Sequence, residues 1–248
     1  MEDFSIIGPD LPEPFRLLVK DSVGSTNDEI RSRAEAGAPE GLIILAHRQT
    51  QGRGRRGAAW FSPPGESLAF SVLIRPSEPK ALWPRLALIA GLAVAEALEN
   101  YIPLVGIKWP NDVWAQGKKI AGILVEAGKD YAVIGIGLNV NTTEFPAEVA
   151  EIATSLSLET GESIPRPEVL AAIISRLAVR RHQIGSDFTS VIDAIRLRCV
   201  LTGNDVTLMT ANGPRSGKVQ SISSHGELIL QTPTGIETLL QADEVRLL

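Results

Sequence analysis

The pattern of secondary structure changes once along the chain, near residue 200, and this change constrains the fold more than any other feature. Before Leu201, runs rich in Val, Ile and Leu alternate with longer segments whose apolar residues recur at helical spacing. After Leu201 only short strand-like runs follow, separated by the turn pairs Asn212-Gly213, His225-Gly226 and Thr234-Gly235. This order predicts an α+β chain with two domains: a mixed β-sheet flanked by helices over residues 1–200, and a small β-barrel over residues 201–248.

The order of the expected elements follows from hydrophobic spacing and from turn and breaker residues. In the first part, strands are expected at residues 15–23, 42–46, 68–74, 106–114, 119–126 and 131–140. Helices are expected at residues 26–36, 84–98, 147–158, 167–181 and 186–197. In the second part, short strands are expected at residues 206–209, 215–221, 227–231, 236–240 and 245–248.

Local signals indicate where several of these elements begin and end. Thr26 and Glu29 have the spacing of a capping box, which indicates a helix start, and Gly37 indicates the end of that helix. Gln116-Gly117-Lys118 lies between two predicted strands and predicts a hairpin. Residues 1–14 contain three prolines, so a loose arm is expected there.

The composition argues against several classes of protein. The 248 residues carry a net charge of -5, which disfavours attraction of the whole protein to nucleic acid or to an anionic membrane. The single cysteine, Cys199, excludes an intramolecular disulfide and a multi-thiolate metal site, and its apolar neighbours predict a buried thiol. The N-terminus has no secretory pattern, and the longest apolar stretch, Leu86 to Leu98, is too short to span a bilayer. A cytoplasmic protein is therefore expected.

Three arginines and three glycines form the segment Gly52-Arg53-Gly54-Arg55-Arg56-Gly57, which follows a predicted strand. Glycine permits the backbone angles that a loop needs to wrap around an anion, and arginine can bind carboxylate or phosphate oxygens with two parallel hydrogen bonds. The segment also fits G-x-G-x-x-G, but a dinucleotide-binding site requires a helix directly after it, which Pro63-Pro64-Gly65 prevents. We therefore expect an anion-binding loop; a basic surface loop or a nucleic-acid patch is the alternative.

Polar residues also gather at the ends of other predicted strands, where binding residues are commonly found. These are Ser25-Thr26-Asn27, Gln49, Lys108 with Asn111-Asp112, Lys119 with Gly122, and Asn139. Neutral amide and hydroxyl groups suit a neutral polar ring, basic groups suit a carboxylate and phosphates, and an aspartate suits magnesium. Each cluster also has a plainer explanation, because Ser and Thr cap helices, Asn and Asp form turns, and lysines are commonly solvated at strand ends.

Several of these segments, in this order, resemble the signature blocks of biotin–protein ligases. The blocks are Gly52 to Gly57 followed by Trp60, then Lys108-Trp109-Pro110-Asn111-Asp112, then Lys119-Ile120-Ala121-Gly122-Ile123-Leu124-Val125-Glu126, supported by Ser25-Thr26-Asn27 and Gly137-Leu138-Asn139-Val140. The resemblance runs from about Ser25 to Asn141 and more loosely to the C-terminus. It implies a biotin/lipoate ligase-like catalytic domain and a small C-terminal SH3-like β-barrel. Some bacterial members carry a DNA-binding helix-turn-helix; the 24 residues before Ser25 are too few for it, so the short class is expected.

The resemblance also implies roles for individual residues. The groups expected to contact biotin are Ser25, Thr26, Asn27, Gln49, Arg53, Gly54, Arg55, Lys119 and Gly122. Those expected to contact ATP are Arg55, Trp60, Asn111, Asp112, Lys119 and Asn139, although Trp60 has a plain core position as its alternative. Arg53, Arg55 and Lys119 are expected to be catalytic, and Asp112 is expected to be a ligand of Mg²⁺.

The activity implied by the resemblance is a ligation in two steps. Biotin and ATP, with Mg²⁺, form biotinyl-5'-AMP, and the biotinyl group then passes to a lysine of a biotin carboxyl carrier protein. Neither DNA nor a membrane is expected as a partner, and monomer and homodimer both stay open. The nearest alternative is a lipoate ligase or lipoyl/octanoyl transferase. A biotin-responsive DNA or RNA regulator is an alternative of a different class.

Overall fold

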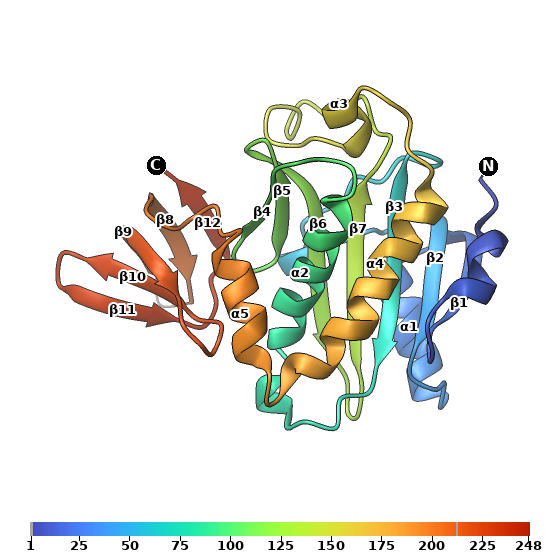
Figure 1. Ribbon diagram of the computed structural model, residues 1–248, viewed down its shortest axis with the longest axis horizontal. Coiled ribbons are helices and arrows are strands. Elements are labelled where there is room, and N and C mark those ends of the chain that lie inside the picture. The colour runs from blue at the N-terminus through green and yellow to red at the C-terminus, as the bar shows by residue number, and fades with distance from the viewer. Residues whose placement is uncertain (1, 212) are drawn as a thin grey trace.

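A computed structural model describes residues 2–211 and 213–248, so Met1 of the predicted arm and Asn212 of the predicted Asn212-Gly213 turn lie outside the described residues. The chain forms a seven-stranded sheet and a five-stranded sheet, which lie beside each other (Figure 1). Among the described residues, no helix is both long enough and apolar enough to cross a membrane.

The larger sheet contains the strands of the first part of the chain in the order β1-β2-β3-β7-β6-β5-β4. Their bounds are β1 Arg16–Val23, β2 Leu42–Gln49, β3 Ser67–Ile74, β4 Val105–Lys108, β5 Asp112–Ala115, β6 Lys118–Ala127 and β7 Ala132–Asn139. β1 and β2 are parallel, and the other neighbours pair antiparallel. The sheet is therefore mixed, as predicted.

Helices cover both faces of this sheet. Their bounds are α1 Thr26–Glu35, α2 Arg85–Leu98, α3 Leu156–Thr160, α4 Arg166–Arg180 and α5 Phe188–Arg196, with 3₁₀-helices at Phe4–Asp10, Arg55–Gly57, Lys80–Leu82 and Arg181–Ile184. Along β2, Ile43 and Leu45 belong to the apolar cluster that contains α2 and α4, whereas Ile44 packs with Ile30 of α1. Successive side chains of a strand point to opposite faces, so α1 lies on one face and α2 and α4 lie on the other (Figure 1).

The smaller sheet has five antiparallel strands in the order β11-β10-β9-β8-β12. Their bounds are β8 Asp205–Thr210, β9 Gly213–Ile222, β10 Leu228–Thr232, β11 Gly235–Leu239 and β12 Glu244–Leu247. The sheet confirms the predicted run of short strands and is consistent with an SH3-like unit. One apolar cluster extends from the larger sheet into this one, through Leu201 and Val206. The division at residue 200 stays a prediction.

Four local predictions were wrong. Residues 106–114 form two strands, β4 and β5, because Pro110 interrupts the strand pattern between them. Residues 147–158 form turns followed by the short helix α3. The expected loose arm contains a 3₁₀-helix, whose Phe4 and Ile7 are buried. Thr26 is not a cap, since Ser25 occupies the N-cap position of α1.

Other local predictions are confirmed, and one is confirmed in part. Gln116 and Gly117 connect β5 and β6 with φ angles of 47° and 81°, which a two-residue hairpin turn of this hand requires. Gly37, which follows α1, has a φ of 88°, as expected of a residue that ends a helix. Cys199 is only partly buried, although it packs against the apolar core.

Candidate active site

A cavity of about 900 Å³ lies on the α1 face of the larger sheet and is bounded on one side by the smaller sheet. It brings together all but one of the residues with an expected role in binding or catalysis: Ser25, Thr26, Asn27, Gln49, Arg53, Gly54, Arg55, Trp60, Asn111, Asp112, Lys119 and Gly122. These residues come from five separate segments of the chain. Asn139 is not among the described residues that line the cavity; its side-chain amide donates to the Thr154 carbonyl at 3.0 Å.

Neutral polar groups occupy the end of the cavity at the start of α1. The Gln49 Oε1 accepts hydrogen bonds from the Thr26 backbone N–H at 2.8 Å and from the Thr26 hydroxyl at 3.0 Å. The Ser71 hydroxyl lies 2.7 Å from Thr26 Oγ1 and 2.5 Å from Asn27 Oδ1. Thr26, Asn27 and Ser71 are all buried. Their hydrogen bonds fix the side chains before any ligand enters, as a site for a polar ring requires.

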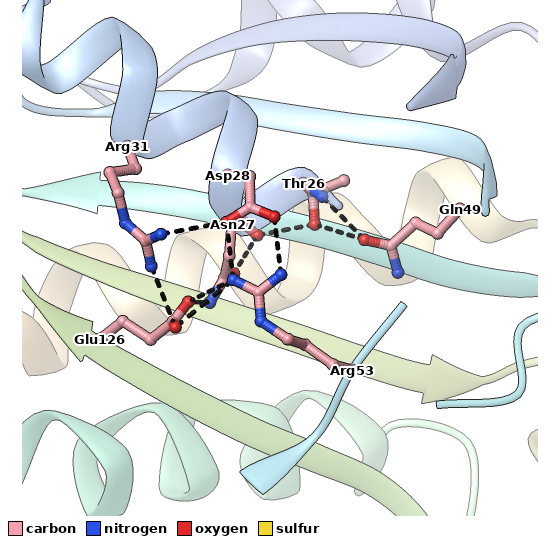
Figure 2. A network of polar contacts seen from close by, with 8 residues as sticks. Thr26, Asn27, Asp28, Arg31, Gln49, Arg53 and Glu126 are labelled. Atoms are coloured by element: carbon pink, nitrogen blue, oxygen red, sulfur yellow. Dashed lines mark hydrogen bonds and ion pairs between the residues drawn. The ribbon is translucent and has the colours of Figure 1, made fainter. Parts of the chain in front are cut away.

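A network of charged groups continues from this end toward the arginine–glycine loop, residues Gly52–Gly57 (Figure 2). Arg53 binds Asp28 through two hydrogen bonds of 2.7 Å and lies 3.3 Å from Glu126 Oε2. Arg31 also contacts Glu126, at 3.0 Å, and Asn27 donates to the same carboxylate at 2.6 Å. Segments from α1, β6 and the loop are thereby held together.

The electrostatics of this network follow from its geometry. The Arg53 guanidinium, bound through two hydrogen bonds, lowers the pKa of the Asp28 carboxyl below its ordinary value. The same pair, assisted by Glu126, raises the pKa of Arg53. Arg53 therefore stays fully charged, and its charge is shared with two carboxylates.

Two glycines on β7 make room for the groups that line the cavity. A Cβ atom at Gly135 would lie 2.3 Å from Asn27 Oδ1, and one at Gly137 would lie 2.2 Å from the Trp60 ring. Both distances are below any contact that a real Cβ makes, so a larger residue would require Asn27 or Trp60 to shift. The Trp60 Nε1 is buried and has no hydrogen-bond partner among the described residues.

The other two arginines of the loop reach the smaller sheet. Arg55 donates to Asn111 Oδ1 at 3.0 Å and to the Ala242 carbonyl at 2.8 Å. Burial lowers the pKa of Arg55, while Asp112 and Asp243 oppose that effect. Arg56 forms an ion pair with Asp243. The loop thus contacts both sheets.

Lys119 and Asp112 lie on neighbouring strands at the floor of the cavity. Their side chains form an ion pair of 2.7 Å, and the Lys119 ammonium lies 5.6 Å from the centre of the Trp60 ring. Among the residues that the structure describes, no three His, Cys, Asp or Glu side chains are grouped to hold a metal ion. Asp112 alone still fits Mg²⁺, which commonly binds one or two carboxylates together with substrate phosphates.

The sequence did not identify several residues of the site. Asp28 lies within a predicted helix, directly after Ser25-Thr26-Asn27, and Glu126 ends the quoted segment that starts at Lys119, but neither was predicted to belong to the site. Spacing carries no signal for Ser71 or Asp243, because the first lies in a fully buried strand and the second lies in a bend before β12. The sequence also did not indicate that the part of the chain around the smaller sheet contributes to the cavity lining, through Met209, Thr210, Ala211, Asp243 and Glu244.

Comparison with known proteins agrees with this arrangement. A family model described as "Biotin/lipoate A/B protein ligase family" matches residues 20–141. The bifunctional ligase/repressor BirA of Bacillus subtilis (strain 168) is 36% identical over 92% of this chain and 73% of its own length, and the biotin--[acetyl-CoA-carboxylase] ligase of Paracoccus denitrificans is 31% identical over 88% and 95%. The biotin protein ligase of Aquifex aeolicus in complex with biotin and ATP superposes with a TM-score of 0.85 at 35% identity, covering 94% of this chain and 99% of that one. The chain belongs to the biotin/lipoate protein ligase family.

Proposed function

We propose that this chain is an ATP-dependent ligase that converts biotin into biotinyl-5'-AMP and transfers the biotinyl group to a lysine of a biotin carboxyl carrier protein. One observation carries the proposal: a single cavity joins a neutral polar end at Thr26, Asn27 and Gln49 to a cationic end at Arg55 and Lys119. Biotin has a neutral ring at one end and a carboxylate at the other, and ATP adds the phosphates. The relatives named for biotin ligation support the choice of substrate.

The first step joins two anions. An oxygen of the biotin carboxylate attacks the α-phosphorus of ATP, and the bond to the pyrophosphate oxygen breaks. Fixed cations stabilise the negative charge that develops, and one well-placed donor contributes about 3–4 kcal/mol. We assign this role to Arg53, Arg55 and Lys119. Their contacts with Asp28, Asn111 and Asp112, respectively, support it, because these hydrogen bonds and the ion pair of Lys119 hold the three side chains in place beforehand.

Magnesium accompanies ATP in this proposal. When bound, it would neutralise phosphate charge, and Asp112 would be its protein ligand. Asn111 and Trp60 are proposed to border the nucleotide, which their position in the cavity lining supports. Asn139 keeps its proposed place on the nucleotide side as a prediction from the resemblance alone.

The second step transfers the acyl group. The ε-amine of the carrier lysine attacks the carbonyl carbon, the bond to the phosphate oxygen breaks, AMP leaves, and the amine loses a proton. A free lysine has a pKa near ~10.4, so the amine must lose its charge before it attacks. Water would hydrolyse the mixed anhydride. The loop at Gly52–Gly57 forms one wall of the cavity and limits the access of water to it.

The expected partners, oligomeric state and cellular location are also proposals. The net charge of -5 supports the absence of DNA binding, which a salt-dependent gel shift would test. β1 and β4 are the edge strands of the larger sheet. The protein is either a monomer or a homodimer that forms through such an edge, and sedimentation would decide between the two. Because the reaction consumes ATP, we place it in the cytoplasm.

Mass spectrometry tests the proposed function directly. A carrier domain incubated with the protein, biotin and Mg-ATP should gain the mass of one biotinyl group on one lysine. ATP–pyrophosphate exchange measured with biotin and with lipoate separates this proposal from a lipoate ligase. Exchange that depends on lipoate and not on biotin would overturn the substrate assignment.

A further inference from the structure

The arginine–glycine loop is attached to the smaller sheet at one short segment. This segment, Ala242-Asp243, directly precedes β12. The Arg55 guanidinium donates to the Ala242 carbonyl at 2.8 Å, and the Arg56 guanidinium pairs with the Asp243 carboxylate. Two neighbouring arginines of the loop therefore bind two neighbouring residues of the segment that leads into β12.

The backbone of Arg56 indicates that this attachment holds the loop in a particular shape. Arg56 has a φ of 56° and a ψ of 26°, the left-handed region that residues other than glycine seldom occupy. Such a conformation persists only where surrounding contacts hold it. Within the loop, Gly54 donates to the Ala58 carbonyl at 2.7 Å and Trp60 donates to that of Gly52 at 3.1 Å. The ion pair with Asp243 is the contact that fixes the Arg56 side chain itself.

Asp243 is placed to affect the whole cationic wall. Its side chain is 18% exposed, whereas that of Arg56 is 60% exposed, so the carboxylate is the more rigid member of the pair. It also lines the cavity beside Arg55, Arg56 and Glu244. The next residue, Glu244, binds Arg246 of its own strand, so in the described structure Asp243 is the carboxylate at this point that contacts the loop.

We infer that Asp243 is a positioning residue of the ligation reaction: through its ion pair with Arg56 it holds the arginine–glycine loop against the cavity and retains the acyl adenylate until the acceptor amine arrives. The inference rests on the proposed function and extends it to the smaller sheet, which thereby supplies a latch for the loop. Asp243 contacts no reacting atom in this scheme. Its effect is on the departure of the intermediate rather than on its formation.

The experiment measures the formation and the release of the adenylate separately, in the full chain. Enzyme is mixed with biotin and α-labelled Mg-ATP; single-turnover quenching gives the rate of adenylate formation, and rapid filtration gives the rate at which labelled adenylate leaves. Asp243→Asn should release adenylate about fivefold faster, the factor expected for one partly exposed ion pair. Its rate of adenylate formation should stay within about twofold of the wild-type rate. Asp243→Asn that retains adenylate as the wild type does would overturn the inference.

A double-mutant cycle identifies the partner through which Asp243 acts. If the effect passes through Arg56, then Arg56→Gln combined with Asp243→Asn should release adenylate no faster than Arg56→Gln alone. Additive effects, or equal losses in formation and retention with a lowered Tm, would overturn the assigned role. Glu237→Gln is the matched control, because Glu237 lies in the same sheet and pairs with Arg215 away from the loop. A wild-type protein that makes no adenylate would instead refute the proposed function.

Discussion

Gly137 of β7 offers a sharp test of whether Trp60 forms a wall of the substrate cavity. The structure leaves no room for a side chain at this position, because an added Cβ would lie 2.2 Å from the Trp60 ring. Ordinary van der Waals contacts begin at 3.4 Å, so Gly137→Ala must displace the ring by more than 1 Å. Trp60 also packs over Gly122, and a Cβ at that glycine would lie 3.2 Å from the ring. The ring must therefore shift from its position over these two glycines.

The size of the effect follows from the energy of such overpacking. An extra methyl group in a tight contact costs about 1–3 kcal/mol. If this cost destabilises the loop in the position that it has here against the cavity, the affinity for the adenylate should fall about 5- to 150-fold. The Lys119 ammonium, which lies 5.6 Å from the same ring, would lose a neighbour that orients it. We expect kcat/KM for biotin-dependent ATP–pyrophosphate exchange to decrease by a similar factor, about 5- to 150-fold.

The assay compares exchange kinetics and thermal unfolding for Gly137→Ala and for a control on another element. Gly91→Ala is the control, since a Cβ at Gly91 of α2 meets only Ile123 Cδ1, at 3.9 Å. It should leave the exchange rate unchanged, and its Tm should stay equal or rise, because alanine favours a helix. Wild-type exchange kinetics in a folded Gly137→Ala protein would refute the reasoning that Trp60 is fixed against the cavity.

The remaining predictions concern charged groups of the cavity. Lys119→Ala should slow adenylate formation at least ~100-fold, as expected for a lost transition-state donor, and quenched-flow measurement of a normal rate would contradict its role. Arg55→Gly should release adenylate and label bystander lysines, and mass spectrometry that finds the acceptor lysine alone modified would refute this. The lowered pKa of Asp28 means that its ionised form stabilises the fold above its ordinary value of 3.8 and that this contribution is lost as the pH falls through the native pKa. Urea unfolding of the wild type and Asp28→Asn should therefore show a difference that is constant near neutral pH and shrinks below pH 3.8.

Much of the fold could be predicted because the local preference for helix or strand agrees with the tertiary packing along most of the chain. The alternation along β2 and the Ile- and Val-rich strands β6 and β7 reflect burial on two faces, which the pattern of apolar residues records. The failures occur where local and tertiary preferences differ. Thr26 has the spacing of a capping residue, yet its hydroxyl binds Gln49, 23 positions away. Phe4 and Ile7 gain a buried position against the core that proline content alone does not reveal.

The site was predictable in its members but not in its internal contacts. Short motifs name residues such as Lys119 and Asn111, because their side chains and spacing suit anions. They do not reveal that the Lys119 ammonium pairs with Asp112, since the pairing depends on the register of β5 against β6. The contribution of Asp243 depends on the position of a second sheet, for which a single sequence carries no signal.

The cations of the cavity differ in how much charge they can offer to a substrate. Arg53 shares its charge with Asp28 and Glu126, Arg56 with Asp243, and Lys119 with Asp112. Arg55 differs, because its hydrogen bonds in the described structure go to the neutral oxygens of Asn111 and Ala242. Burial lowers the pKa of Arg55, because its charged form loses contact with water there. A substrate phosphate would therefore form its strongest ion pair with Arg55. The cations that are already paired with carboxylates are held in place by these partners and can stabilise negative charge as it develops.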